Sequence, residues 1–98
     1  MSSEALYEQY KDALKRGHVA ALRGRVDEAL LAYAEAARIA PERSTPHSSA
    51  GTALLRRKRP ADALRHYEVA LKIAPRDEGS LLGRAQALAA LDLSLIHI

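Results

Sequence analysis

Apolar and small residues recur along this chain at helical spacing, in stretches separated by short polar turns. Between residues 4 and 23 they fall three or four positions apart, for example at Tyr10, Ala13 and Gly17. That spacing is the 3.6-residue period of an amphipathic helix. The same period predicts four more helices, over residues 26–40, 45–57, 60–74 and 78–91. The chain is therefore predicted to be all-α, with five helices.

Residues that start and stop helices lie at the ends of these stretches. Ser2 or Ser3 is expected to cap the first helix, because a hydroxyl can accept a hydrogen bond from a free N–H of the first turn. The sequence Ser44-Thr45-Pro46 predicts a hydroxyl cap followed by proline at the first helical position. Asp77 is expected to cap the last helix.

Two of the predicted helices carry the same sixteen-residue pattern. Residues 26–41 read VDEALLAYAEAARIAP, and residues 60–75 read PADALRHYEVALKIAP, with seven identical positions that all share one 34-residue offset. The same offset relates Gly17 to Gly51. A fixed offset of this size is typical of a stacked structural repeat.

The recurring glycine, alanine, tyrosine and proline positions resemble the signature of the tetratricopeptide repeat. They are Gly17, Ala29, Tyr33, Ala36 and Pro41, and then Gly51, Ala63, Tyr67, Ala70 and Pro75. The resemblance implies a solenoid of helical hairpins with about two and a half repeats. It divides the chain into a helix extension (1–9), a first repeat (10–43), a second repeat (44–77), the first helix of a third repeat (78–92) and a tail (93–98).

Small side chains are expected at the closest helix contacts, since helix separation depends on the residues at the contact. We expect Gly17 to pack against Ala29 and Gly51 against Ala63. Ala85 holds the corresponding place in the third repeat. One face of that helix carries Leu81, Leu82, Ala85, Leu88 and Leu91. We expect its leucines at 82, 88 and 91 to be exposed and to cause weak self-association.

The resemblance also implies a concave groove lined by the first helix of each repeat, which binds a peptide or a partner protein. The groove positions we select are Lys11, Leu14, Lys15, His18, Thr45, Ser48, Ser49, Thr52, Leu55, Leu82 and Gln86. Some family members clamp a carboxylate with Lys, Asn and Arg, but those places hold Leu14, His18, Ser49, Gly79 and Gly83 here. We therefore expect an extended peptide with an acidic residue near Lys11 and Lys15.

Composition removes several other classes of function. The chain has no cysteine, so it forms no disulfide and no cysteine-ligated zinc site. Its four histidines, at 18, 47, 66 and 97, match no metal-binding motif, and no nucleophile or phosphate-loop motif is present. We expect no cofactor, no metal and no enzymatic activity. No signal peptide or long apolar segment appears, so we expect a cytoplasmic protein without membrane association.

Two alternative functions remain open at this point. The chain could be the N-terminal recruitment module of a longer enzyme. It could also bind nucleic acid, since its net charge is +3 and residues 56–59 read Arg-Arg-Lys-Arg. We consider nucleic acid the weaker alternative, because no aromatic residue for base stacking flanks this run.

Residues 93–98, Leu-Ser-Leu-Ile-His-Ile, differ abruptly from the alanine-rich and charged sequence before them. The repeat offset puts His97 in the small-residue place of Ala29 and Ala63. The codons CTG-TCT-CTT-ATA-CAC-ATC would encode this hexapeptide, and that DNA resembles a transposon end used as an adapter in library preparation. We expect a turn to begin near Asp92 in the natural protein and the six residues to be foreign to it.

Sequencing the source genome past the Asp92 codon tests this expectation. We expect a turn containing Gly or Asp, then alanine in the place of His97, and an aromatic residue four positions later. A genome that encodes Leu-Ser-Leu-Ile-His-Ile followed by a stop codon would contradict it.

Overall fold

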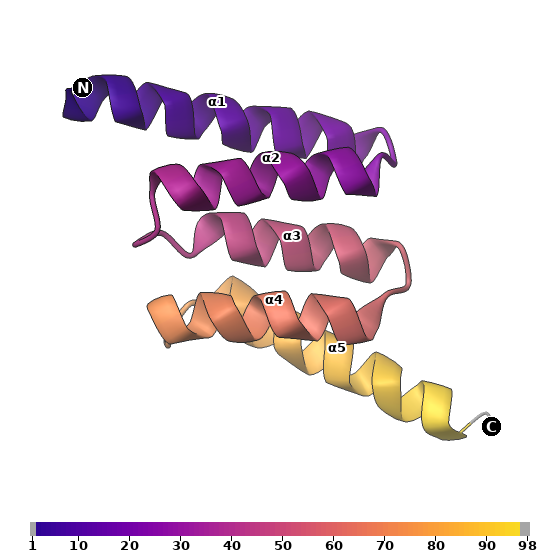
Figure 1. Ribbon diagram of the computed structural model, residues 1–98. Coiled ribbons are helices and arrows are strands. Elements are labelled where there is room, and N and C mark those ends of the chain that lie inside the picture. The colour runs from indigo at the N-terminus through magenta and orange to yellow at the C-terminus, as the bar shows by residue number, and fades with distance from the viewer. Residues whose placement is uncertain (1, 97–98) are drawn as a thin grey trace.

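The computed structural model describes residues 2–96, and side chains up to Leu93. This part of the chain is entirely helical between its turns (Figure 1). Its five helices are α1 (Ser3–Leu22), α2 (Val26–Ile39), α3 (Thr45–Arg56), α4 (Pro60–Ile73) and α5 (Glu78–Ile96). The prediction of an all-α chain with five helices is confirmed.

Each helix packs against the next one along the chain. Figure 1 shows α1 to α4 lying side by side as a stack, with the chain reversing direction at each turn. The alternate helices α1 and α3 also touch, as do α3 and α5. Within the described residues no such contact joins α2 and α4, so α1, α3 and α5 form the more closely gathered side of the stack.

The helix starts agree with the sequence prediction at two of three caps. The Ser2 hydroxyl accepts a hydrogen bond from the Ala5 N–H at 3.1 Å. The Asp77 carboxylate accepts from the Ser80 N–H at 2.9 Å. The predicted hydroxyl cap at Ser44 is wrong: its side chain makes no capping bond, because its backbone is already near-helical (φ −81°, ψ −21°). Thr45 rather than Pro46 is consequently the first residue of α3.

The last helix is longer than the sequence predicted. We expected it to end near Leu91 with a turn at Asp92, but α5 continues to Ile96. Residues 88–96 contain neither glycine nor proline and are rich in leucine and alanine, which favour helix continuation. His97 and Ile98 lie outside the described residues, and the foreign origin of residues 93–98 stays a prediction.

Two tyrosine rings and the glycines beside them form the centre of the packing. Tyr33 and Tyr67 are only 3% and 2% exposed. A Cβ built on Gly51 would lie 2.9 Å from Cε1 of Tyr67, and one built on Gly17 would overlap the ring of Tyr33 still more. The side chain nearest to each glycine is therefore a tyrosine ring, and not Ala29 or Ala63 as the sequence analysis expected. The alanines are fully buried, but the ring of the tyrosine one turn further on covers the glycine.

Most of the repeated positions behave alike in the two halves. Ala36 and Ala70 are completely buried, as are Ala29 and Ala63. Pro41 lies in the turn that follows α2, and Pro75 lies in the turn that follows α4. These alanine and proline positions therefore occupy similar environments in the two halves.

A third glycine contacts Tyr67 from the following helix. Gly83 of α5 lies against the Tyr67 ring, so this ring is enclosed by glycines of both α3 and α5. Ala85, which holds the place of Gly17 and Gly51 in the repeat offset, is exposed. The buried face of α5 is accordingly Ser80, Gly83 and Ala87. Leu82 and Leu88 are exposed as predicted, whereas Leu91 is half-buried.

The glycine contact on α5 predicts opposite effects for two alanine substitutions on the same helix. Gly83→Ala should lower the free energy of unfolding by about 1–3 kcal/mol, because the new methyl group overlaps the Tyr67 ring. Gly79→Ala is the matched control: its Cβ would lie 3.7 Å from Asp77. There the lost flexibility of glycine should stabilise the chain by up to about 1 kcal/mol. Urea unfolding of both variants measures the difference, and equal midpoints would contradict the tight contact.

Candidate functional site

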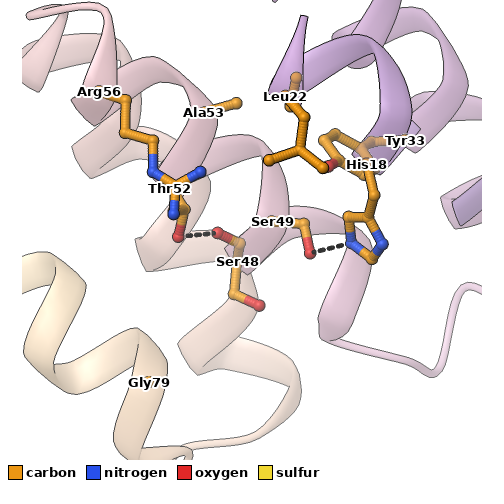
Figure 2. Close-up of a pocket in the computed structure, with 10 residues that line it drawn as sticks. His18, Leu22, Tyr33, Ser48, Ser49, Thr52, Ala53, Arg56 and Gly79 are labelled. Carbon is orange, nitrogen blue, oxygen red and sulfur yellow. Dashed lines mark hydrogen bonds between the residues drawn. The ribbon is translucent and has the colours of Figure 1, made fainter. Parts of the chain in front are cut away.

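Two hollows lie next to each other on the side formed by α1, α3 and α5. The first has a volume of about 370 Å³, and Figure 2 shows its lining. It is lined by His18, Ala21, Leu22, Tyr33, Ser48, Ser49, Thr52, Ala53, Arg56 and Gly79. The second, of about 360 Å³, is lined by Thr52, Leu55, Arg56, Tyr67, Gly79, Leu82, Gly83 and Gln86. Because they share Thr52, Arg56 and Gly79, we treat them as one groove.

The groove gathers seven of the eleven residues that the sequence assigned to it. The first hollow contains His18, Ser48, Ser49 and Thr52. The second contains Thr52, Leu55, Leu82 and Gln86. These residues come from three helices that are distant in sequence, and the packing of alternate helices brings them together.

Four predicted residues lie elsewhere. Lys15 lines a separate hollow between α1 and α2. Leu14 packs into the core beside Tyr10 and Ala13. Lys11 pairs with Glu8 at 3.1 Å, and its ammonium lies 4.9 Å from the centre of the Tyr7 ring. Thr45 is exposed at the first position of α3 and lines neither hollow. The expectation of an acidic residue bound near Lys11 and Lys15 is thus not supported in this groove, because neither lysine lines it.

Sequence reasoning missed the two tyrosines as groove residues and gave them only a structural role. Tyr33 lines the first hollow and Tyr67 the second. A tyrosine can bury its ring and still present its hydroxyl at a polar surface. That dual character is the signal that could have identified both residues.

The residue after each glycine touches the tyrosine of its own repeat. The imidazole of His18 meets the ring of Tyr33 edge to face, with centroids 5.5 Å apart. In the equivalent place of the next repeat, Thr52 Oγ1 lies 2.9 Å from the hydroxyl oxygen of Tyr67. The Thr52 hydroxyl also donates to the Ser48 carbonyl at 3.1 Å, so the Tyr67 hydroxyl acts as the donor to Thr52. In both hollows, therefore, the side chain that follows the glycine contacts the tyrosine that lines the hollow.

One full positive charge stands in the groove, on Arg56. No carboxylate lines either hollow. Among the side chains described up to Leu93, none forms an ion pair with Arg56. Burial raises the pKa of the Tyr33 hydroxyl, and the nearby Arg56 charge acts in the opposite direction. The groove therefore presents an uncompensated cation among hydroxyl and apolar side chains, which favours an anionic group in a ligand.

The basic run at residues 56–59 does not form one continuous surface. Arg56 faces the groove, whereas Arg59 binds Asp62 at 2.8 Å. Lys58 stands at the turn with a left-handed backbone, φ +61°. The Arg59 guanidinium holds the pKa of the Asp62 carboxyl below its ordinary value, mainly through their hydrogen bond. Part of the charge that could attract nucleic acid is already paired.

The groove contains a histidine next to a serine, a combination that also occurs in the active sites of hydrolases. His18 Nε2 lies 3.3 Å from Ser49 Oγ. A serine nucleophile needs an oriented base, usually held by a third polar group. No carboxylate is bonded to His18 in the described part of the chain. The pair by itself supplies a polar contact rather than a catalytic constellation.

Two other features are missing from the described residues. No cluster of three or more histidine, aspartate or glutamate side chains that could bind a metal ion occurs among them. Likewise, none of the helices in this part of the chain has the length and hydropathy required to span a membrane. Comparison of the chain with protein-family models and with curated proteins found no match.

His47 on α3 and His66 on α4 are close enough for their charges to interact. Burial lowers the pKa of His47. Burial also lowers the pKa of His66, and the neighbouring His47 lowers it further, while Asp62 one turn earlier acts in the opposite direction. The spacing of Asp62 and His66 on one helix face went unnoticed at the level of sequence. Both imidazoles are therefore neutral in the folded chain over a wider pH range than in the unfolded chain.

This pair predicts that the chain is less stable in mild acid. Below the ordinary histidine pKa of 6.5 the unfolded chain binds more protons than the folded one. The free energy of unfolding should therefore fall as pH drops from 7 and level off below the folded pKa values. In the double variant His47→Gln/His66→Gln, the decrease in the free energy of unfolding with falling pH should be smaller than in the parent. The control variant His18→Gln, which changes a groove residue, should show the same decrease as the parent. Urea titrations at a series of pH values decide, and an unchanged fall in the double variant would contradict the assignment.

Proposed function

We propose that the chain is a protein-interaction module of the tetratricopeptide-repeat type, which binds an extended peptide segment in its groove. Two complete repeats, 10–43 and 44–77, and a further first helix would form it. The support is the recurrence of the same environments at the repeat offset. Gly17 and Gly51 meet tyrosine rings in the same way, and four alanines at paired positions are fully buried. Stacked helical hairpins of this kind use their concave surface for binding.

The observation that carries the proposal is the position of Arg56. It stands where the two hollows meet, without a carboxylate in either lining. Exposed Leu22 and buried Tyr33 offer apolar surface on one side of it, and Leu55 and Leu82 do so on the other. The favoured ligand is an extended segment with one acidic residue that contacts Arg56 and apolar residues on both sides.

Hydroxyl groups provide the polar part of this recognition. Ser48, Ser49 and Thr52 lie along α3 at the floor of the first hollow (Figure 2). Hydroxyls both donate and accept hydrogen bonds. They suit the alternating N–H and C=O groups of an extended peptide backbone, which needs partners for both when it leaves water.

We propose a binding role and not a catalytic one. The groove's nucleophile and base, Ser49 and His18, have no third group to orient them. A module of this kind serves equally as a free-standing scaffold or as the recruitment part of a longer enzyme. Nucleic-acid binding is the less favoured role, because Arg59 is paired with Asp62 and Arg56 is turned to the groove.

A peptide selection tests the proposed function. A library of random linear peptides displayed on phage would be selected against the full chain, and enriched peptides would be synthesised. We expect them to share an acidic residue with apolar neighbours. Arg56→Glu should weaken their binding at least about tenfold, equivalent to 1.4 kcal/mol, as measured by fluorescence polarisation.

The control is Arg57→Glu, which makes the same charge change one residue further on, outside both hollows. It should retain the affinity of the parent. Peptides that bind Arg56→Glu and the parent equally would overturn the groove as their site. A selection that enriches no peptide would count against the binding role itself.

A further inference from the structure

One face of α5 is exposed although the equivalent faces of α1 and α3 are buried. Leu88 is 46% exposed, whereas Leu54 and Ala20, at the equivalent places of α3 and α1, are 1% and 7% exposed. Leu81 is 38% exposed, and its counterpart Ala13 is fully buried. Ala85 is likewise exposed where Gly17 and Gly51 are buried. The face formed by Leu81, Ala85 and Leu88 is called the α5 face below.

On α1 and α3, the equivalent face is covered by the next helix of the chain, which is α2 or α4. Ala20 packs with Ala29 and Tyr33 of α2. Leu54 packs with Ala63 and Tyr67 of α4. Figure 1 shows the C-terminal half of α5 running clear of α4. The α5 face is thus built on the pattern of a helix-packing surface and has no helix over it in the described chain.

A helix like α2 or α4 would not pack on it in the same way. Those helices place a tyrosine ring over a glycine, so closely that even an alanine methyl at Gly51 would come within 2.9 Å of the ring. The corresponding residue of α5 is Ala85. An occupant with smaller or more flexible residues at its centre, such as leucine and alanine, fits this face without such a shift.

The α5 helix itself has this composition. Between residues 79 and 93 its only charged residues are Arg84 and Asp92, and both are exposed. In an antiparallel pair of α5 helices centred on Leu88, Arg84 of each chain stands opposite Asp92 of the other, because each is four residues from the centre. Such a two-fold contact brings identical surfaces together and here also joins opposite charges.

We propose that the α5 face binds the α5 face of a second copy of this chain, in an antiparallel arrangement centred on Leu88. In this register the Leu88 side chains of the two copies meet at the centre, Ala85 of each copy lies opposite Leu91 of the other, and two Arg84–Asp92 pairs flank them. One helix pair buries less than the roughly 1,600 Å² of a standard interface. The dimer is therefore weak and depends on protein concentration. The groove residues His18, Thr52 and Arg56 take no part in it.

Sedimentation velocity over a dilution series tests the proposal. The parent should shift from twice the mass of the single chain towards the single mass as it is diluted. Leu88→Glu should remain a monomer at every concentration. Leu31→Glu is the matched control, since Leu31 is a 74% exposed leucine on α2, and it should associate like the parent. Far-UV circular dichroism would verify that both variants are folded.

An exchange of the two charged residues distinguishes the antiparallel geometry from non-specific hydrophobic association. Arg84→Glu alone and Asp92→Arg alone should each weaken the dimer, because like charges then face each other. The double variant Arg84→Glu/Asp92→Arg should regain the dissociation constant of the parent. A parent that is monomeric throughout, association that survives Leu88→Glu, or a double variant no better than the single ones would each overturn the proposal.

Discussion

The contact between a tyrosine ring and a glycine of a neighbouring helix is the constraint on which the stack depends. At Gly17 and Gly51 there is no room for even one carbon atom beside the rings of Tyr33 and Tyr67. A glycine within a helix costs about 1 kcal/mol relative to alanine. The nearly complete burial of a large aromatic side chain offsets that cost, since such a ring removes roughly 150–250 Å² of surface from water. The ring sets the distance between the helices, and the glycine permits it.

The same tyrosines connect the packing to the groove. Each ring lies in the core, and each residue also lines one of the two hollows. Tyr67 donates to Thr52, and Tyr33 contacts His18, so two groove side chains are positioned by residues of the second helix in each pair. A substitution at either tyrosine would therefore disturb both stability and the groove. The two properties are not independent in this molecule.

The two ends of the stack differ in chemistry. On α1, the positions that correspond to buried Pro46 and Ala50 are Asp12 and Arg16. Arg16 bonds to Asp12 at 3.0 Å and to Glu35 at 2.6 Å, so this end is covered by paired charges. At the other end the outer face of α5 carries leucines and few charges. Charged surfaces stay in water, whereas an apolar helix face gains free energy by association. This asymmetry is why the proposed self-association is assigned to α5 alone.

The sequence by itself determined the helical class, the number of helices and most of their ends. The 3.6-residue period, the prolines after two helices and the acceptor side chains at Ser2 and Asp77 are local features, and local physics suffices to interpret them. The resemblance to the tetratricopeptide repeat also indicated the seven residues that line the groove, because it implies a groove at fixed places in the first helix of each repeat. The continuation of α5 past Asp92 is the exception: a run of good helix formers carries the helix through the place where a repeat boundary was expected.

Only the tertiary structure decided which surfaces meet. It showed that Gly83 contacts Tyr67 and that α5 buries Ser80, Gly83 and Ala87 rather than its leucine-rich face. It placed Lys15 outside the groove and left Arg56 inside it without a carboxylate. A periodic sequence specifies that a helix has a buried face. The rotation of that helix about its axis depends on the shapes of its neighbours, and those shapes exist only once the chain has folded.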